Sequence, residues 1–147
     1  MSDASSTGLT PFHLAFPVHD LESAREFYTQ ALGAGTGRES DHWIDFDLHG
    51  HQIVADYKEG MTTGIDATNA VDGDDVPVPH FGVVLTMEDW KAMAERLQAR
   101  ADTRWVIEPR IRFEGQPGEQ ATFFLLDPSG NALEFKAFAD MSALFAT

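Results

Sequence analysis

The sequence contains no cysteine, and this absence removes a whole range of chemistry. Without thiols the chain has no disulfide, no thiolate metal site and no cysteine nucleophile. A bound metal ion would therefore need nitrogen and oxygen ligands. The sequence also has no run close to the ~18 apolar residues that a membrane-spanning helix needs, so no membrane partner is expected.

Basic residues are scarce: 10 Lys and Arg stand against 24 Asp and Glu, for a net charge of −14. This charge repels phosphate backbones, so nucleic acid is not an expected partner. No glycine-rich phosphate loop with a lysine and no Gly-x-Ser-x-Gly elbow is present, and no nucleophile is assigned. Residues 1–10 lack the basic and apolar regions of a signal peptide, so we expect a flexible tail and a cytoplasmic protein.

What the sequence does contain is a repeat. Residues 43–50 and 123–130 are both apolar, strand-like runs that end in Asp-x-x-Gly, and each leads into another apolar run. Upstream of each copy lies an apolar segment with one histidine, His13 or His80, and then an amphipathic helix. We interpret the chain as one supersecondary unit written twice.

The pattern predicts strand, helix and three strands, in that order and in both copies. The first module covers 11–57 and the second covers 80–147, together forming a single domain. Between them, 58–79 is rich in glycine, proline and aspartate, which favours a linker or a mobile flap. In the second module, short strands are expected at 105–107 and 111–113.

Local signals place the first helix. Asp20 is a good N-cap, and the apolar residues that follow recur at helical spacing. Gly33 is a suitable helix end, and Gly35 and Gly37 are expected to extend the break after it.

Three strand residues carry the predicted chemistry. His13 and His80 occupy matching positions in the two copies, each seven residues before a helix start, and Glu134 lies in an otherwise apolar strand. An ionised carboxylate there is costly to bury unless it is paired or bound to a cation. Two histidines and one carboxylate can hold a metal ion and leave coordination positions open. Taken singly, each histidine is more often an ordinary core residue, and Glu134 more often forms a salt bridge, for example with Lys136.

A family resemblance follows from these residues. Residues 13–16, 20–21 and 27–28, with the closing run 127–135, resemble the vicinal oxygen chelate (VOC) superfamily. That superfamily includes glyoxalase I, extradiol dioxygenases, fosfomycin resistance enzymes and bleomycin-binding proteins. The resemblance implies an α+β fold of two βαβββ modules, which form a half-open mixed barrel around a divalent metal with helices on the outer face. It also implies a homodimer. In some members of the superfamily, each site is built from modules of two different chains.

By position, His13, His80 and Glu134 match three ligand sites of this superfamily. Aligning the two Asp-x-x-Gly turns puts Val54 opposite Glu134, and valine cannot bind a metal. Shifting this alignment by two residues would put Gln52 or Asp56 opposite Glu134 in place of Val54. Both residues share the Val54 face, and they are the candidates for a fourth ligand or for the pocket. The simplest alignment leaves three protein ligands and an open side.

The favoured function is a divalent-metal-dependent enzyme whose small-molecule substrate chelates through vicinal oxygens. An extradiol-dioxygenase-like reaction ranks slightly above a glyoxalase-I-like isomerisation, with Fe²⁺ favoured over Zn²⁺, Ni²⁺ or Mn²⁺. Lys136 and Arg112 are candidate pocket residues, and Arg110 with Arg112 can hold an anionic substrate group, although ordinary surface arginines are the commoner case. The alternative to an enzyme is a drug-sequestering protein of the bleomycin-resistance type. Thiol or phosphonate transfer of the fosfomycin-resistance kind ranks lower, because its potassium-binding loop is not seen.

Overall fold

The computed structural model describes residues 8–61, 68–71 and 74–147. Most of the expected tail at 1–10 and part of the expected linker at 58–79 therefore lie outside the described residues. The chain divides into two units, one formed by residues 1–63 with 128–131 and the other by residues 64–127 with 132–147.

The first unit is a four-stranded mixed sheet with one helical segment. Its elements in chain order are β1 (His13–Val18), α1 (Leu21–Glu26), the π-helix η2 (Phe27–Ala31), β2 (Gly35–Glu39), β3 (Trp43–Leu48) and β4 (His51–Tyr57). The strand order is β1-β4-β3-β2, with β1 parallel to β4 and the other pairs antiparallel. The connection between the parallel strands β1 and β4 runs through the helical segment and then through β2 and β3.

Strand alternation in the first unit separates a packed face from an open one. Phe16 and Val18 of β1 are buried, whereas His13 is exposed. Tyr28 of η2 is fully buried, and its ring centroid lies 5.2 Å from those of both Phe16 and Phe46. The helical segment therefore covers one face of this sheet, and His13 belongs to the other face.

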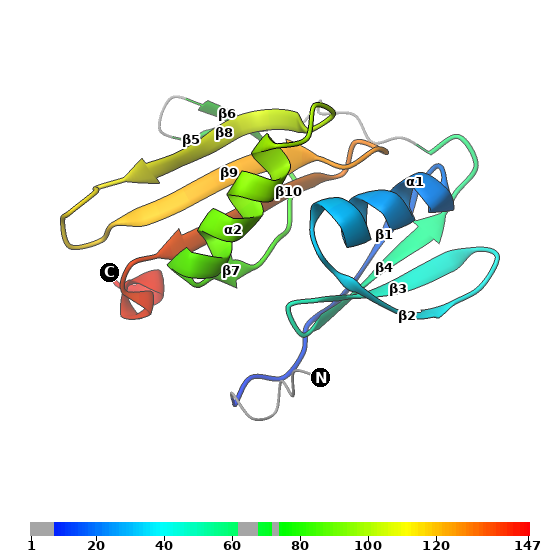
Figure 1. Cartoon of the computed structure of the whole chain (residues 1–147), viewed down its shortest axis with the longest axis horizontal. Helices are drawn as coiled ribbons and strands as arrows, with labels where there is room; N and C mark the ends of the chain where they lie inside the picture. The colour runs from blue at the N-terminus through cyan, green and yellow to red at the C-terminus, as the bar shows by residue number, and fades with distance from the viewer. Residues whose placement is uncertain (1–7, 62–67, 72–73) are drawn as a thin grey trace. The chain divides into compact units, whose positions relative to one another are not determined.

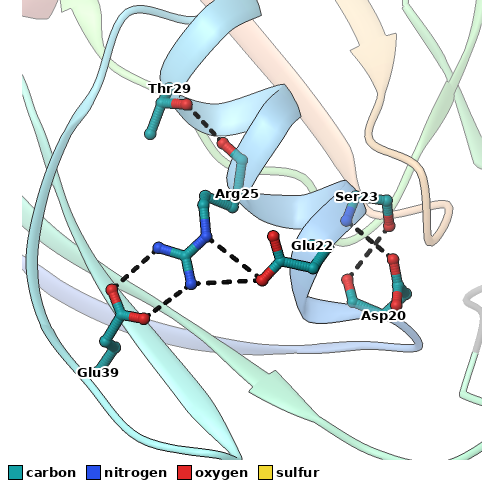
Figure 2. A network of polar contacts seen from close by, with 6 residues as sticks. All are labelled: Asp20, Glu22, Ser23, Arg25, Thr29 and Glu39. Atoms are coloured by element: carbon teal, nitrogen blue, oxygen red, sulfur yellow. Dashed lines mark hydrogen bonds and ion pairs between the residues drawn. The ribbon is translucent and has the colours of Figure 1, made fainter.

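The helix start is held by the cap that the sequence predicts. The Asp20 carboxylate accepts a hydrogen bond of 2.8 Å from the Ser23 backbone N–H, and this bond lowers the Asp20 pKa (Figure 2). One turn later, Arg25 forms a two-pronged ion pair with Glu39 of β2, at 2.7 and 2.9 Å. This pair lowers the pKa of Glu39 and joins the helix to the edge strand of the same unit.

The turn at 128–131 is part of the first unit through polar contacts to the end of β1. The buried Ser129 hydroxyl accepts the His19 backbone N–H at 2.9 Å and lies 2.7 Å from His19 Nδ1. Asn131 donates to the Pro17 carbonyl at 2.8 Å. Through these contacts Ser129 and Asn131 hold the 128–131 turn against the end of β1.

The second unit repeats the first. Its elements are β5 (Thr68–Val71), β6 (Asp74–Pro77), β7 (Val84–Leu85), α2 (Met87–Gln98), β8 (Arg104–Arg112), β9 (Gln120–Leu126), β10 (Ala132–Phe138) and the 3₁₀ helix η3 (Met141–Phe145). The main sheet has the order β7-β10-β9-β8, with β7 parallel to β10, and β5 and β6 form a separate hairpin within the expected linker. Figure 1 shows α2 across one face of its own sheet. There the buried Trp90 indole donates to the Phe135 carbonyl at 2.9 Å.

The prediction of two βαβββ modules in an α+β fold is confirmed. The glycines that end the two Asp-x-x-Gly turns share one feature: Gly50 and Gly130 both have φ of 88°, a left-handed conformation that favours glycine. Each four-stranded sheet is open, and each is covered on one face by its own helix. No helix among the described residues is long and apolar enough to cross a membrane.

Three local expectations differ from the structure. Gly35 and Gly37 lie within the edge strand β2 instead of a break, because pairing with β3 stabilises them in extended form. The two short strands expected around Pro109 are one continuous strand, β8. A proline is tolerated there because β8 is an edge strand, where a missing N–H costs no ladder bond. The expected single helix is α-helical only to Glu26 and continues as a π-helix.

Candidate functional site

A cavity of about 200 Å³ lies in the second unit, on the face of the sheet opposite α2. It is lined by Val76, His80, Ile107, Arg110, Arg112, Gln120, Thr122, Phe124, Glu134 and Lys136. All four predicted site residues of this unit are among them: His80, Glu134, Lys136 and Arg112. Strand alternation explains the selection, since Leu133 and Phe135 are fully buried on the helix side while Glu134 and Lys136 are half-buried on the cavity side.

His80 faces Glu134 in this cavity. The His80 Nε2 atom lies 3.4 Å from Glu134 Oε1, and both side chains are largely buried. The other ring nitrogen, Nδ1, lies 2.7 Å from the Pro77 carbonyl oxygen. A carbonyl can only accept, so Nδ1 carries a hydrogen, and Nε2 is the ring nitrogen that faces the carboxylate. The edge of the Phe124 ring packs against the imidazole at a centroid distance of 5.0 Å.

Glu134 is oriented by a second group. Its Oε2 atom accepts a hydrogen bond of 2.7 Å from the Thr122 hydroxyl on the neighbouring strand β9. Backbone contact also places it: the Glu134 N–H donates to the Phe81 carbonyl at 2.9 Å. Beside this bond, Gly82 approaches the Glu134 carbonyl so closely that a Cβ atom would overlap it. A glycine is therefore required for the strand that follows His80 to lie against β10.

The donor set of this pair fits a divalent metal ion. An imidazole Nε2 and a carboxylate oxygen are ligands of Zn²⁺, Fe²⁺, Ni²⁺ and Mn²⁺. The bonds to the Pro77 carbonyl and from Thr122 are the kind of outer contacts that orient such ligands. Within residues 8–61, 68–71 and 74–147, however, no group of three His, Asp or Glu side chains is gathered closely enough to hold a metal.

His13 lies in the first unit and is also held through Nδ1. Its Nδ1 atom lies 2.7 Å from Oε1 of Gln52, the residue level with it on the parallel strand β4. The Gln52 amide donates in turn to Asp45 Oδ2 at 3.4 Å, which leaves Oε1 as the acceptor. His13 Nδ1 is therefore the donor, and Nε2 is the ring nitrogen left to bind a ligand, as in His80.

The strand registers align the two modules as the repeat predicts. His13 is level with Gln52, and the bridge between Phe81 and Leu133 sets His80 level with Ala132. Counting two residues further along β4 brings Val54, which is buried, to the place that Glu134 occupies on β10. Asp56, the other candidate on this face, is half-buried and lies across from Trp43 of β3.

Four supporting groups of the site escaped sequence reasoning: Thr122, Gly82, Asp45 and the Pro77 carbonyl. Thr122 could have been found from the hairpin register. Pairing β9 with β10 about their turn places Thr122 level with Lys136, which is two residues from Glu134 on the same face of β10. The only sequence signal for Gly82 is its place two residues after the candidate ligand His80. The other two depend on side-chain and loop geometry that no local pattern encodes.

A model of the Glyoxalase/Bleomycin resistance protein/Dioxygenase superfamily matches residues 10–135. No curated protein matches the chain.

Several solved structures share its fold. A glyoxalase/bleomycin resistance protein/dioxygenase from Alicyclobacillus acidocaldarius is 29% identical, with a TM-score of 0.73 over 92% of this chain and 96% of that one. A protein with the same description from Nocardioides is 24% identical, with a TM-score of 0.58 over 90% of this chain and 85% of that one. The fosfomycin resistance protein FosX from Listeria monocytogenes is 18% identical, with a TM-score of 0.62 over 88% and 93%.

Proposed function

The chain belongs to the Glyoxalase/Bleomycin resistance protein/Dioxygenase superfamily, and we propose that it is a divalent-metal-dependent enzyme acting on a small molecule that carries two neighbouring oxygens. The observation that carries this proposal is the His80–Glu134 pair, with Nε2 and Oε1 at 3.4 Å inside a cavity. Both members are oriented by further hydrogen bonds, which is typical of metal ligands.

The proposed ligands are His80, Glu134 and His13. The first two are supported by their mutual geometry. His13 is supported by the family resemblance and by its tautomer, since Gln52 holds Nδ1 and leaves Nε2 to bind. A metal bound by these three residues would keep open positions and act as a Lewis acid or, if redox-active, as an oxygen activator.

The other residues of the cavity have positioning roles in this proposal. Thr122 keeps one carboxylate oxygen of Glu134 engaged, so that the other oxygen points toward His80. Phe124 and Ile107 provide an apolar wall beside the pair, which limits access of water. Lys136 and Arg112, the candidate pocket residues, line the same cavity, where their positive charges would balance negative charge on a substrate.

An extradiol-dioxygenase-like reaction with Fe²⁺ remains slightly favoured over a glyoxalase-I-like isomerisation. The reason is the side chain at the fourth position, where buried Val54 stands in place of a ligand. Gln52 is engaged with His13, which favours a positioning role over that of a fourth ligand. A homodimer in the cytoplasm is the assembly and location that this proposal includes.

Metal analysis tests the proposal directly. The full chain, purified without added metal, is compared with His80→Ala, Glu134→Ala and His13→Ala by elemental analysis and by thermal unfolding with and without Fe²⁺. We expect wild-type protein to retain metal and each variant to lose most of it. His42→Ala is the matched control, because His42 lies in an exposed turn between β2 and β3.

The outcome also separates the reactions. Iron together with catechol-dependent oxygen uptake supports the dioxygenase-like reaction, whereas nickel or zinc with activity on a hemithioacetal supports the glyoxalase-like one. Equal metal content and equal thermal stability in wild type and all four variants would contradict a metal enzyme. That result would favour the drug-sequestering alternative.

A further inference from the structure

The second-unit cavity carries a second cluster beside the His80–Glu134 pair. We propose that this cavity binds a small organic oxyanion, a carboxylate or a phosphonate, over Thr122 between Arg110 and Lys136. The inference extends the proposed function by naming a substrate class for the same cavity, and it rests on that function for the identity of the reacting group.

Strand register brings the three residues into one row. Thr122 of β9 is level with Lys136 of β10 on one side and with Arg110 of β8 on the other. Cross-strand neighbours on one face have Cβ atoms about 5 Å apart, so two long cationic side chains flank a hydroxyl. All three residues line the cavity. Charged donors on both sides of the Thr122 position suit the several lone pairs of an oxyanion.

The next row of the same face contains the proposed metal ligand. Glu134 is level with Phe124, two residues from Lys136 and Thr122 along their strands. Two residues of strand span about 7 Å, which is comparable to a substituted six-membered ring. A molecule with two neighbouring oxygens at His80 and Glu134 can therefore place an anionic group on the opposite side of such a ring, between Arg110 and Lys136.

The charge of the lining supports an anion. Three of the chain's 10 Lys and Arg residues, namely Arg110, Arg112 and Lys136, line this one cavity, against a single carboxylate. The whole chain has a net charge of −14, so the excess of positive side chains in the cavity lining is opposite in sign to the net charge of the chain. A solvated surface of this protein would be expected to show the opposite balance. This contrast also counts against a cationic drug as the occupant.

The volume limits the size of the ligand. The cavity is about 200 Å³, below the ~300–1,000 Å³ typical of sites for drug-sized molecules. A single ring with one anionic substituent is an appropriate size. Gln120 and Arg112, one row beyond Thr122, close the far end of this lining.

Calorimetric titration of the full chain, both as purified and after metal removal, tests the inference. The probes are benzoate, phenylphosphonate and neutral benzamide, which share the ring and differ in charge. We expect one or both oxyanions to bind at least about tenfold more tightly than benzamide, the gain of one charge-assisted hydrogen bond. Lys136→Met and Arg110→Gln should each remove most of that gain, whereas Lys58→Met, a lysine at the exposed end of β4, should leave it intact.

The stronger of the two oxyanions identifies the anionic group as carboxylate or phosphonate. Equal affinity for all three probes would overturn the inference, and so would oxyanion binding that is unchanged in both Lys136→Met and Arg110→Gln. Because binding is also measured on metal-free chain, this result is independent of the metal test. Oxyanion binding without any metal retention would refute the metal function alone.

Discussion

Gln52 holds His13 through a contact of 2.7 Å between Oε1 and Nδ1. The glutamine is itself oriented, because its amide donates to Asp45 on the adjacent strand. This chain of contacts crosses three neighbouring strands and leaves His13 Nε2 with the lone pair. Gln52 is therefore a positioning residue for His13 in the proposed site.

The role of Gln52 can be measured by metal affinity. Gln52→Leu removes the acceptor for His13 Nδ1 and should weaken Fe²⁺ binding by about 10–100-fold, the usual effect of losing such an outer contact. Gln52→Glu keeps an acceptor oxygen and should stay closer to wild type. The double variant with His13→Ala should bind no more weakly than His13→Ala alone, since Gln52 acts through the histidine. Additive losses would instead show that Gln52 is a ligand.

Thr122 provides an equally sharp test on the second unit. Thr122→Val is nearly isosteric but removes the hydroxyl that donates to Glu134 Oε2. We expect metal affinity to fall by about tenfold or more, because the carboxylate loses its orienting bond. Thr122→Ser keeps the hydroxyl and serves as control. Identical metal binding in the Val and Ser variants would be inconsistent with this role.

Gly82 should be intolerant of any side chain. A Cβ atom there would overlap the Glu134 carbonyl, so Gly82→Ala must push the segment after His80 away from β10. We expect a loss of about 1–3 kcal/mol in the free energy of unfolding, measured by urea denaturation. Gly35→Ala is the matched control. Its Cβ would lie 3.8 Å from that of Asp47, an ordinary contact, and its stability should stay within about 0.5 kcal/mol of wild type.

The Asp20 cap predicts how stability depends on pH. The Ser23 N–H stabilises the carboxylate and holds the Asp20 pKa below its ordinary value of 3.8. A depressed pKa gives a contribution that is fully present above the ordinary value and lost as the pH falls through the folded-state pKa. Asp20→Asn keeps a capping oxygen without the titration. Its melting temperature should match wild type at neutral pH, and its decrease below pH 3.8 should be shallower. Parallel acid profiles for the two proteins would contradict this role of the cap.

Much of the fold could be read from the chain because its signals are local. The Asp20 cap, the helix end at Gly33 and the two Asp-x-x-Gly turns depend on residues close in sequence. The last strand, Ala132–Phe138, follows the second of these turns, where the sequence places an apolar run. The position of the edge strand β2 was not predicted, since its glycines are extended only through pairing with β3. Propensity is overridden there by a contact between separate strands.

The candidate site could be predicted from the sequence to the same extent. The repeat singled out His13 and His80, and an acidic residue in an apolar strand singled out Glu134. Their supporting partners depend on register. Thr122 meets Glu134 through the hairpin, and Gln52 meets His13 through a parallel crossover 39 residues away. No pattern within one segment specifies such pairs.

The amino-acid pattern alone specifies a duplicated βαβββ chain, free of thiol chemistry, with His13 and His80 at matching positions of the two copies and Glu134 in the last strand. Alternation and repetition suffice for this, because both are properties of neighbouring residues. Three relationships follow from the folded structure and not from the pattern: His80 faces Glu134, Gln52 holds His13, and Arg110 and Lys136 flank Thr122. These relationships arise from strand register and side-chain packing, which are set by the free energy of the whole fold.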